Sequence, residues 1–473
     1  MSREFIVLMK SYTVMGGRYE LNYNKEDFLK WDGQYVWHPF TQMKEYCSEE
    51  ILMIERGEGC YLWDIDGNKY IDAVSSIWLN VHGHSRKEIN DALKKQIDLI
   101  AHSTLLGQAN VPSTILAKKL VDITPEGITR VFYSDNGATS VEVALKLAFQ
   151  YWQHKGKKDK TKFISLKRGY HGDTIGSVSV GGVDLFHSIF SPLLFEGYKA
   201  DVPYCYRCPL NLSHDTCELA CTEQVKQIME KHSEEIAAFI MEPEVIAAGG
   251  IISVPRGYLK KIKQLCDEYN ILLILDEVAV GFGRTGTMFA CEHENVSPDF
   301  MCLSKGITGG YIPLAATITT DEIYNAFWGE EDLKFTHGHS YTGNQLGCSA
   351  ALASLEIFEK ENVISAIQPK IEYLKKLLEK FWEIENVGDI RQRGFMIGIE
   401  LVEDRKTKKP FTFKKKLGHR VIMEARKRGL ILRPIVDVIE IVPMLCVSEE
   451  ELSFICEKTF ESIKAVLRDV NAK

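Results

Sequence analysis

The sequence predicts an α/β fold, with a mainly parallel sheet covered by helices and a smaller α+β domain after it. Between about residues 85 and 330, short and strongly apolar segments of strand length alternate with amphipathic segments of helix length. Strands that are apolar on both faces are typical of a parallel sheet buried between helices. After about residue 345, amphipathic helices come first and short apolar runs follow. We therefore predict an N-terminal segment that joins the small domain (1–75), a large domain (76–345) and a C-terminal small domain (346–473).

The individual elements support this order. The stretch GCYLWDIDGNKYIDAVS (59–75) has two apolar runs around Asp66-Gly67, which predicts a β-hairpin. Apolar residues recur on one helical face in SVEVALKLAFQYW (140–152), and GYLKKIKQLCDEYN (257–270) is also expected to be a helix. The expected strands are TRVFYS (129–134), KFISL (162–166), AAFIME (237–242), ILLILDE (271–277), DFMCLS (299–304) and, in the small domain, GFMIGIEL (394–401) and LILRP (430–434).

Composition limits the classes of function. Apolar residues make up 45% and charged residues 26% of the 473 residues, and the formal net charge is −8, with acids and bases mixed along the chain. No basic track suggests a nucleic-acid partner, and no apolar run approaches the roughly 20 residues that span a membrane. The N-terminal apolar core FIVLM is shorter than a signal peptide requires. We therefore expect a cytoplasmic protein that binds neither nucleic acid nor membrane.

An acid and a lysine stand at the ends of two neighbouring predicted strands. Asp276 ends ILLILDE, where a buried carboxylate needs a partner that offsets its desolvation, and Lys305 follows DFMCLS. Apolar neighbours favour the neutral, nucleophilic amine of a lysine. Ligands in such folds bind beyond the C-terminal ends of the strands. An acid and a lysine in one crevice therefore indicate pyridoxal phosphate, because the lysine can bond to its aldehyde while the carboxylate keeps its pyridine nitrogen protonated. Taken alone, Asp276 would be a helix cap or a surface acid.

A phosphate site is expected in the same crevice. YSDNGATSVEVALKLA (133–148) runs from a strand through Gly137 and Ala138 into a helix, and backbone N–H groups at the start of a helix bind phosphate. GYHGDT (169–174) offers Tyr170, an aromatic side chain that would lie near the cofactor ring. Without that context, Tyr170 would be a half-buried core tyrosine.

Together these motifs resemble those of the class III pyridoxal-phosphate aminotransferases, which have fold type I. The resemblance extends from about residue 34 onward and is carried by YSDNGA (133–138), GYHGDT (169–174), DEVAVGFGRTG (276–286), LSKGITGG (303–310) and HGHSYTGNQLGC (337–348). A closer resemblance, to the members that convert 8-amino-7-oxononanoate to 7,8-diaminononanoate in biotin synthesis, is carried by WHPFTQM (37–43), SSIWLNVHGH (75–84) and LILRP (430–434).

The resemblance implies a cofactor-binding role for six matching positions besides Tyr170. Lys305 would form the covalent bond to pyridoxal 5'-phosphate, and Asp276 would contact its ring nitrogen. Gly137 and Ala138 match the phosphate-binding pair, and His339 and Ser340 match a pair that the neighbouring subunit contributes to the phosphate. The resemblance therefore implies a homodimer with shared active sites and a ping-pong transfer of an amino group.

The remaining matches are substrate contacts, at Phe40, Trp78, Tyr170, Gly338 and Arg433. Arg433 matches the arginine that binds the carboxylate of 8-amino-7-oxononanoate, a role that suits the planar fork of a guanidinium group. Taken alone, Arg433 would be a surface base on an edge strand.

Some positions depart from the pattern and leave the amino donor open. Phe40 stands where the members that use S-adenosylmethionine have a tyrosine, and Ile77-Trp78 stands where they have two tryptophans. The sequence is closer to the branch thought to use lysine, so both donors are kept. Ile246-Ala247 also replaces the glutamine-glycine pair usual after Glu242-Pro243.

Two other functions are weighed against this one. Another class III enzyme would act on 4-aminobutyrate, ornithine or a diamine, and WHPFTQM and Trp78 argue against it. A non-catalytic binding or assembly protein would keep the fold without the chemistry, and Lys305 and Asp276 argue against that.

Four of the 12 cysteines are clustered in YCYRCPLNLSHDTCELAC (204–221). Two residues separate Cys205 from Cys208, and three separate Cys217 from Cys221, which is a spacing found in zinc and iron–sulfur sites. The alternative is a set of thiols in a surface insertion. Aminotransferase chemistry needs no metal, so we predict none in the active site.

Overall fold

The computed structural model describes residues 13–15, 18–20, 23–213 and 215–471. FIVLM, on which the expectation about a signal peptide rests, lies outside the described residues. The chain forms two compact units, of which the first holds residues up to 57 together with 62–69, and the second holds 58–61 and the residues from 70 onward. The predicted domain boundaries at residues 75 and 345 stay a prediction.

The first unit carries two short helices, two three-residue strands and most of two further strands. Its elements are β1 (Thr13–Met15), β2 (Arg18–Glu20), α1 (Lys25–Tyr35), α2 (Met43–Tyr46), β3 (Ile54–Glu58) and β4 (Tyr61–Asp64). Helix α1 begins after Asn24, whose side chain accepts a hydrogen bond from the Asp27 N–H. The expected turn follows β4, where the Asp64 N–H donates to the Asn68 carbonyl at 3.1 Å and Gly67 has a φ of 84°. A residue in this left-handed region is most easily a glycine, which explains the Asp-Gly signal.

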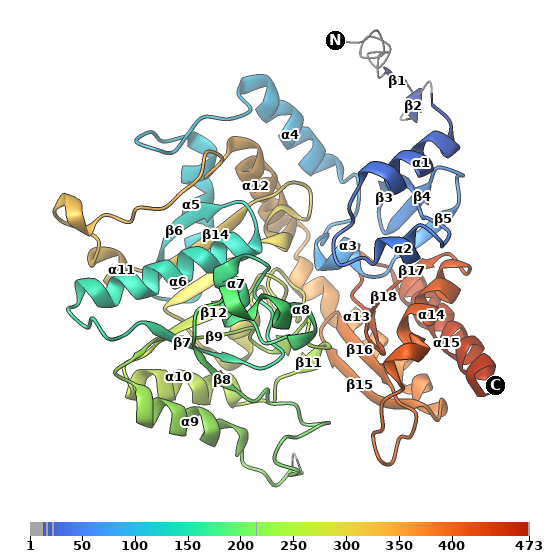
Figure 1. Ribbon diagram of the computed structural model, residues 1–473. Helices are drawn as coiled ribbons and strands as arrows, with labels where there is room; N and C mark the ends of the chain where they lie inside the picture. Colours follow the sequence, from blue (N-terminus) through green and yellow to red (C-terminus); the bar gives the residue numbers. More distant parts are fainter. Residues whose placement is uncertain (1–12, 16–17, 21–22, 214, 472–473) are drawn as a thin grey trace. The chain divides into compact units, whose positions relative to one another are not determined.

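A seven-stranded sheet forms the centre of the second unit, as Figure 1 shows. Its strand order is β6 (Ile128–Ser134), β14 (Ala315–Thr320), β13 (Phe300–Leu303), β12 (Leu272–Asp276), β9 (Ile236–Met241), β7 (Lys162–Leu166) and β8 (Tyr198–Ala200). Strands β13, β12, β9, β7 and β8 pair in parallel, and β14 is antiparallel to both of its neighbours. The predicted α/β fold with a mainly parallel sheet is confirmed.

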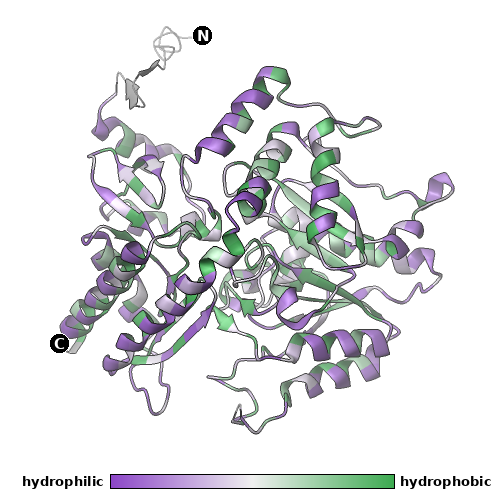
Figure 2. Ribbon diagram, turned by 180° about the vertical axis from the view of Figure 1, so that it is seen from behind, coloured by the Kyte–Doolittle hydropathy of each residue, from purple (hydrophilic) through white to green (hydrophobic). Residues whose placement is uncertain are grey.

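Helices cover both faces of this sheet, because successive side chains of a strand point to opposite faces. Leu273 and Leu275 of β12 lie in the core that also contains apolar residues of α9, α10 and α12, whereas Leu272 and Ile274 lie in the core formed with α6. In Figure 2 strands of the sheet are green and the outer surfaces of helices are largely purple. The helices up to β14 are α3 (Ser75–Trp78), α4 (Lys87–Leu99), α5 (Val111–Ile123), α6 (Gly137–His154), α7 (Ile175–Val180), α8 (Asp184–His187), α9 (Cys221–His232) and α10 (Tyr258–Glu268).

The C-terminal part combines long helices with a small antiparallel sheet. After α11 (Asp321–Asn325), the chain forms α12 (Gln345–Lys360), α13 (Val363–Leu378), α14 (Leu417–Arg426) and α15 (Glu449–Asn471). The sheet order is β15 (Val387–Arg393), β16 (Met396–Leu401), β19 (Val438–Ile441) and β18 (Arg433–Ile435).

The predicted strand LILRP is divided between two sheets. Its first half, β17 (Leu430–Ile431), pairs in parallel with Ile71 and Asp72 of β5 (Lys69–Asp72), and its second half, β18, pairs with β19. Pro434 has no N–H to donate, which suits the edge position of β18.

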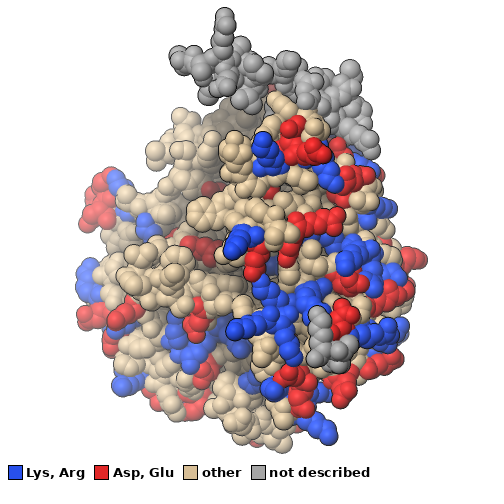
Figure 3. Space-filling view, turned by 45° about the vertical axis from the view of Figure 1, so that its right-hand side comes forward, with Lys and Arg blue, Asp and Glu red and all other residues tan. Residues whose placement is uncertain are grey.

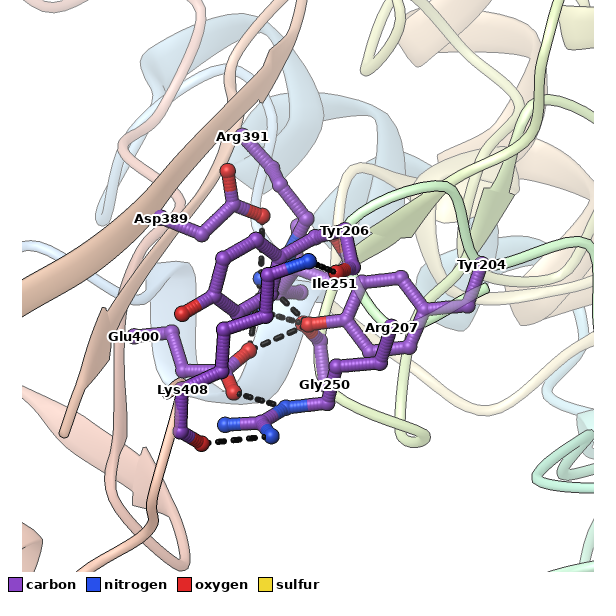
Figure 4. Close-up of polar contacts among 9 residues, drawn as sticks. All are labelled: Tyr204, Tyr206, Arg207, Gly250, Ile251, Asp389, Arg391, Glu400 and Lys408. Carbon is purple, nitrogen blue, oxygen red and sulfur yellow. Dashed lines mark hydrogen bonds and ion pairs between the residues drawn. The ribbon is translucent and has the colours of Figure 1, made fainter. Parts of the chain in front are cut away.

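A buried ionic network joins the small sheet to two loops of the large sheet (Figure 4). Arg391 of β15 donates to Glu400 of β16 and to Asp389, both at 2.7 Å, and to the Tyr204 hydroxyl at 2.6 Å. It also donates to the carbonyls of Gly250 and Ile251, between β10 (Val245–Ile246) and β11 (Ile252–Ser253). The Arg391 guanidinium therefore bonds to two carboxylates, one hydroxyl and two backbone carbonyls.

Acidic and basic side chains are intermixed over most of the face drawn in Figure 3. Within the part of the chain that the structure describes, none of the helices combines the length and the apolar character needed to cross a membrane.

Candidate active site

A cavity of about 670 Å³ lies where β12 and β13 end and α6 begins. Six of the predicted residues line it: Trp78, Gly137, Ala138, Tyr170, Asp276 and Lys305. Parallel strands place the residues that follow them on one edge of the sheet, which is why residues far apart in the sequence meet here.

Asp276 is the last residue of β12 and is only 3% exposed. One carboxylate oxygen lies 2.7 Å from His171 Nδ1, and the other accepts the Val278 N–H at 3.1 Å. His171 Nε2 has no hydrogen-bond partner among the described residues. This histidine was not predicted as a site residue, although it is the third residue of the GYHGDT motif. Both residues line the cavity, so this contact holds the Asp276 carboxylate at the cavity wall.

Lys305 follows β13 in a left-handed backbone conformation, with a φ of 45°. Burial lowers the pKa of its amine to about 8, although the charges of Asp276 and Glu242 oppose the shift. A non-glycine residue in this conformation is uncommon and marks positions where function sets the geometry. The amine is therefore more nucleophilic at neutral pH than that of an ordinary lysine.

The N-terminus of α6 faces the cavity through Gly137 and Ala138. Asn136 caps the helix by accepting the Thr139 N–H at 3.1 Å. A Cβ atom at Gly137 would lie 2.6 Å from the side chain of Val278, and one at Gly172 would lie 2.4 Å from Ala138 Cβ. The close approach of these segments requires glycine at both places and keeps the first N–H groups of an 18-residue helix directed at the cavity.

Glu242 is a cavity residue that sequence reasoning missed. It lies one residue after β9 and is 3% exposed, and its carboxylate accepts the Ala247 N–H at 2.9 Å and the Tyr170 N–H at 3.2 Å. Burial, together with the nearby charge of Asp276, raises its pKa to about 8. The glutamate-proline pair was the available signal. Nothing in the structure explains why Ile246 and Ala247 replace the usual glutamine and glycine.

Three predicted substrate contacts lie around the reactive lysine. The Trp78 ring centroid is 4.8 Å from Lys305 Nζ and 5.7 Å from Arg433 Cζ. The Tyr170 hydroxyl donates to Asp173 at 2.6 Å, and burial raises the pKa of this phenol. Tyr170 therefore stays protonated, with its hydroxyl directed at a neighbouring carboxylate.

Five predicted residues do not line this cavity, and one of them, Arg433, lies beside the Trp78 ring. Phe40 belongs to the first unit, where its side chain is 62% exposed, and its role stays a prediction. Gly338, His339 and Ser340 lie between β14 and α12, and among the described residues they do not line the cavity. His339 Nε2 is 3.9 Å from Asp135 of its own chain, and the Ser340 carbonyl lies 2.7 Å from His102 Nε2. Their predicted contact with a second subunit is untested.

The cavity residues fit pyridoxal phosphate. Lys305 supplies an amine with a lowered pKa, Asp276 supplies a buried carboxylate for the ring nitrogen, and the start of α6 supplies N–H groups for the phosphate. An aromatic wall, Trp78, completes the cavity. These groups can hold an aldehyde cofactor and exchange an amino group through it.

The fold and the site define a pyridoxal-phosphate enzyme, and the sequence profile of the family described as "Aminotransferase class-III" matches residues 43–466. The chain belongs to this family, and it is a pyridoxal-phosphate-dependent aminotransferase.

Two similar proteins from different organisms share one name. An adenosylmethionine-8-amino-7-oxononanoate aminotransferase of Methanocaldococcus jannaschii is 55% identical over 457 residues, which cover 94% of this chain and 99% of that protein. The protein of the same name from Helicobacter pylori is 38% identical, and the match covers 90% of this chain and 95% of that protein.

Solved structures agree with the fold. The crystal structure of the M. jannaschii aminotransferase has a TM-score of 0.90 at 54% identity and covers 93% of this chain and 99% of its own. An (S)-enantioselective omega-transaminase from Thermomicrobium roseum has a TM-score of 0.89 at 34% identity, and the match covers 95% of this chain and 99% of that one.

The cysteine cluster lies outside this cavity. Cys205, Cys208, Cys217 and Cys221 line a separate small cavity of about 20 Å³ together with prolines and leucines. Among the residues that the structure describes, no three histidine, cysteine, aspartate or glutamate side chains are grouped as metal ligands would be.

Proposed function

We propose that this aminotransferase transfers an amino group to the C7 ketone of 8-amino-7-oxononanoate and so forms 7,8-diaminononanoate in biotin synthesis. The observation that carries the proposal is the placement of Lys305 Nζ and Arg433 Cζ at 4.8 Å and 5.7 Å from the centroid of one indole ring, that of Trp78. The acceptor has a carboxylate far from its reacting ketone. It therefore needs a fixed cation and a reactive amine along one apolar wall. The names of the similar proteins support the same substrate.

The chain's own residues then have defined tasks. Bound pyridoxal phosphate supplies an electron sink for the carbon that exchanges its amino group. Asp276 holds positive charge at the pyridine nitrogen, and the N–H groups at Gly137 and Ala138 hold the phosphate. Lys305 Nζ removes and returns the proton at the reacting carbon. Because burial lowers its pKa to about 8, a larger share of this amine is neutral at pH 7 than of an ordinary lysine.

Arg433 binds the acceptor's carboxylate in this proposal. Phe40, Trp78, Tyr170 and Gly338 form the remaining substrate contacts, with Trp78 as the wall beside the methylene chain. A bidentate arginine–carboxylate pair at a half-buried position is stronger than a fully exposed one, because water competes less for both groups. Arg433 therefore sets which end of the acceptor faces Lys305.

The assembly is part of the same proposal. The protein is a cytoplasmic homodimer that binds neither nucleic acid nor membrane, and His339 and Ser340 of each subunit complete the phosphate site of the other. Mixing inactive Lys305→Ala with an inactive His339 and Ser340 double variant should restore part of the activity through hybrid dimers. A fully active monomer in sedimentation would contradict this arrangement.

Arg433→Ala tests the substrate assignment. We expect acceptor binding to weaken by roughly 2–4 kcal/mol, because the substrate carboxylate is left without its partner. Arg433→Lys is the matched control, since it keeps the charge and loses the two-pronged contact, and it should fall between the parent and the alanine variant. The measurement follows cofactor absorbance in each half-reaction separately. An acceptor half-reaction with unchanged apparent affinity in Arg433→Ala would place the carboxylate site elsewhere.

The donor is S-adenosylmethionine or lysine. Compared with the members that use S-adenosylmethionine, Phe40 lacks a tyrosine hydroxyl and Ile77 lacks an aromatic wall, which favours lysine, whereas the names of the similar proteins favour S-adenosylmethionine. Single-turnover assays that offer each donor alone, read by cofactor absorbance, separate the two. Turnover with 4-aminobutyrate, ornithine or a diamine, and none with 8-amino-7-oxononanoate, would instead assign the chain to another branch of the family.

A further inference from the structure

Trp78 is held in an unusual piece of backbone. The four residues Ser75 to Trp78 all have left-handed conformations, with φ values of 50°, 50°, 67° and 63°. Residues other than glycine rarely adopt this backbone conformation, and a run of four is strongly disfavoured in isolation. Surrounding contacts must therefore stabilise the turn.

Three side chains fasten this turn. Asp72 accepts hydrogen bonds from the Ser76 N–H at 3.0 Å and from the Ser76 hydroxyl at 2.7 Å. The Ser75 hydroxyl donates to the Val442 carbonyl at 2.6 Å. At the far end, the indole Nε1–H of Trp78 donates to Glu440 Oε2 at 2.9 Å. The contacts of Ser75 and Ser76 hold the turn, and the contact of Trp78 holds the ring.

Glu440 is costly to bury in this position. It lies in the middle of β19 with no exposed surface, opposite Arg433 of the edge strand and Gly398 of β16. Its second carboxylate oxygen, Oε1, has no hydrogen-bond partner among the described residues. Burial raises its pKa to about 7, and the charges of Arg433 and Lys305 oppose that shift. A carboxylate so placed needs a reason that core packing does not supply.

We propose that Glu440 is a positioning residue that fixes the indole of Trp78, so that the ring stays against both Lys305 and Arg433 and sets the path of the substrate chain between them. The proposal rests on the proposed function for the identity of that chain. Glu440 has no exposed surface, so it acts by holding Trp78 rather than on the substrate itself. No local pattern indicates this role, because an acid in VIEIV (438–442) looks like any polar residue in a strand.

Substitutions at Glu440 separate anchoring from burial. Glu440→Gln keeps an oxygen that accepts the indole N–H, and Glu440→Leu leaves that N–H without a partner. We expect the KM for 8-amino-7-oxononanoate to rise about tenfold in Glu440→Leu and to stay within about threefold of the parent in Glu440→Gln. In a Trp78→Phe background, which has no N–H to hold, adding Glu440→Leu should change the KM by less than about threefold, because the two residues act as one unit.

A matched control is available in the same sheet. Glu400 is another buried carboxylate, bonded to Arg391 and Arg207 instead of to Trp78 (Figure 4). Glu400→Gln should lower the unfolding temperature without raising the KM for the acceptor. This control removes a buried charge and leaves the indole anchored.

A second readout uses no substrate. The difference in fluorescence between the cofactor-free parent and cofactor-free Trp78→Phe isolates the emission of Trp78. We expect that emission to shift in Glu440→Leu and to be unchanged in Glu440→Gln, and crystal structures of both variants should show the indole displaced only in the leucine variant.

Three results would overturn the role of Glu440: equal losses in the glutamine and leucine variants, an unmoved indole in Glu440→Leu, or the same loss from Glu440→Leu with and without Trp78. If the parent fails to aminate 8-amino-7-oxononanoate, the proposed function falls, and the fluorescence and crystallographic results still decide the role of Glu440.

Discussion

Two groups of buried charges in this molecule are balanced in opposite ways. In the cavity, burial raises the pKa of Glu242 to about 8 and lowers the pKa of Lys305 to about 8. In the network of Figure 4, burial alone would raise the pKa of Glu400, but the charge of Arg391 and hydrogen bonds from Tyr204 and Arg207 lower it. The difference indicates that the network is complete without a ligand, whereas the cavity keeps charges that a ligand must complete.

The two groups should also differ in the sign of their pH dependence. Glu400 has a lowered pKa, so its contribution to stability is present at neutral pH and is lost as the pH falls through that pKa. Glu242 has a raised pKa, so the folded cofactor-free protein binds more protons than the unfolded chain between about 4.5 and 8. Its contribution therefore becomes less favourable as the pH rises through that range.

The largest expected effect is at Lys305. Lys305→Ala should reduce turnover by roughly ten thousandfold, or about 5 kcal/mol, because both the covalent attachment and the proton transfer are lost. The cofactor-free variant should keep most of its stability, because burial disfavours the charged amine that it removes. Borohydride reduction of the parent, followed by peptide mass mapping, should place the pyridoxyl group on Lys305. A label on another lysine would show that the cavity amine is not the attachment point.

The network should respond in the reverse way. Arg391→Ala should lower the free energy of unfolding by about 3–5 kcal/mol, because Glu400 and Asp389 lose their buried partner. The absorbance spectrum of the bound cofactor should remain that of the parent, since none of the hydrogen-bond partners of Arg391 lines the active-site cavity. Denaturant unfolding measures the first effect, and absorbance measures the second.

Lys167→Ala is the matched control for that experiment, because it removes a cation from an ion pair with Asp201 at the surface. It should cost about 1 kcal/mol or less. If Arg391→Ala cost no more than this control, the network would not be the structural element that its geometry indicates.

Asp276→Asn should give a smaller loss than Lys305→Ala. The amide still reaches His171 and the backbone, so the cofactor should remain bound, but the ring nitrogen loses its counter-charge. We expect turnover to fall roughly a hundredfold, or about 2.7 kcal/mol. Turnover within about twofold of the parent, under 1 kcal/mol, would remove the electron-sink role from Asp276.

Local signals in the sequence were sufficient for the strands, the acid and the lysine. Asp276 and Lys305 follow apolar segments that can only be buried strands, and their meeting follows from the rule that ligands bind at the carboxyl ends of such strands. Gly137 and Ala138 were predicted because a strand that runs directly into a helix leaves backbone N–H groups free to bind phosphate, and because they match the family's phosphate-binding pair.

Other residues could not be predicted because their roles depend on pairing across the sheets. His171 and Glu242 reach the site through contacts with Asp276 and with the Tyr170 N–H, which no local pattern encodes. Glu440 meets Trp78 across 362 residues of sequence. The division of LILRP between two sheets likewise depends on β5 and β19, which lie elsewhere in the chain.

The cysteine cluster should give the smallest effect, and it tests how far spacing alone indicates function. Cys205, Cys208, Cys217 and Cys221 share a cavity of about 20 Å³, which is room for about one water molecule, and the rest of its lining is almost wholly apolar. Burial raises the pKa of the Cys221 thiol to about 11 and also raises that of Cys205, whereas metals bind the thiolate.

We therefore expect zinc and iron well below one atom per chain in protein purified without chelator. Cys221→Ser should change the free energy of unfolding by less than about 1 kcal/mol. Cys47→Ser, at an exposed cysteine outside the cluster, is the matched control. The opposite result would be one zinc per chain that a chelator removes, with a fall in unfolding temperature that Cys47→Ser does not reproduce. It would show that the four thiols are metal ligands. The cluster would then stabilise the same loop that contributes Tyr204 and Arg207 to the Arg391 network.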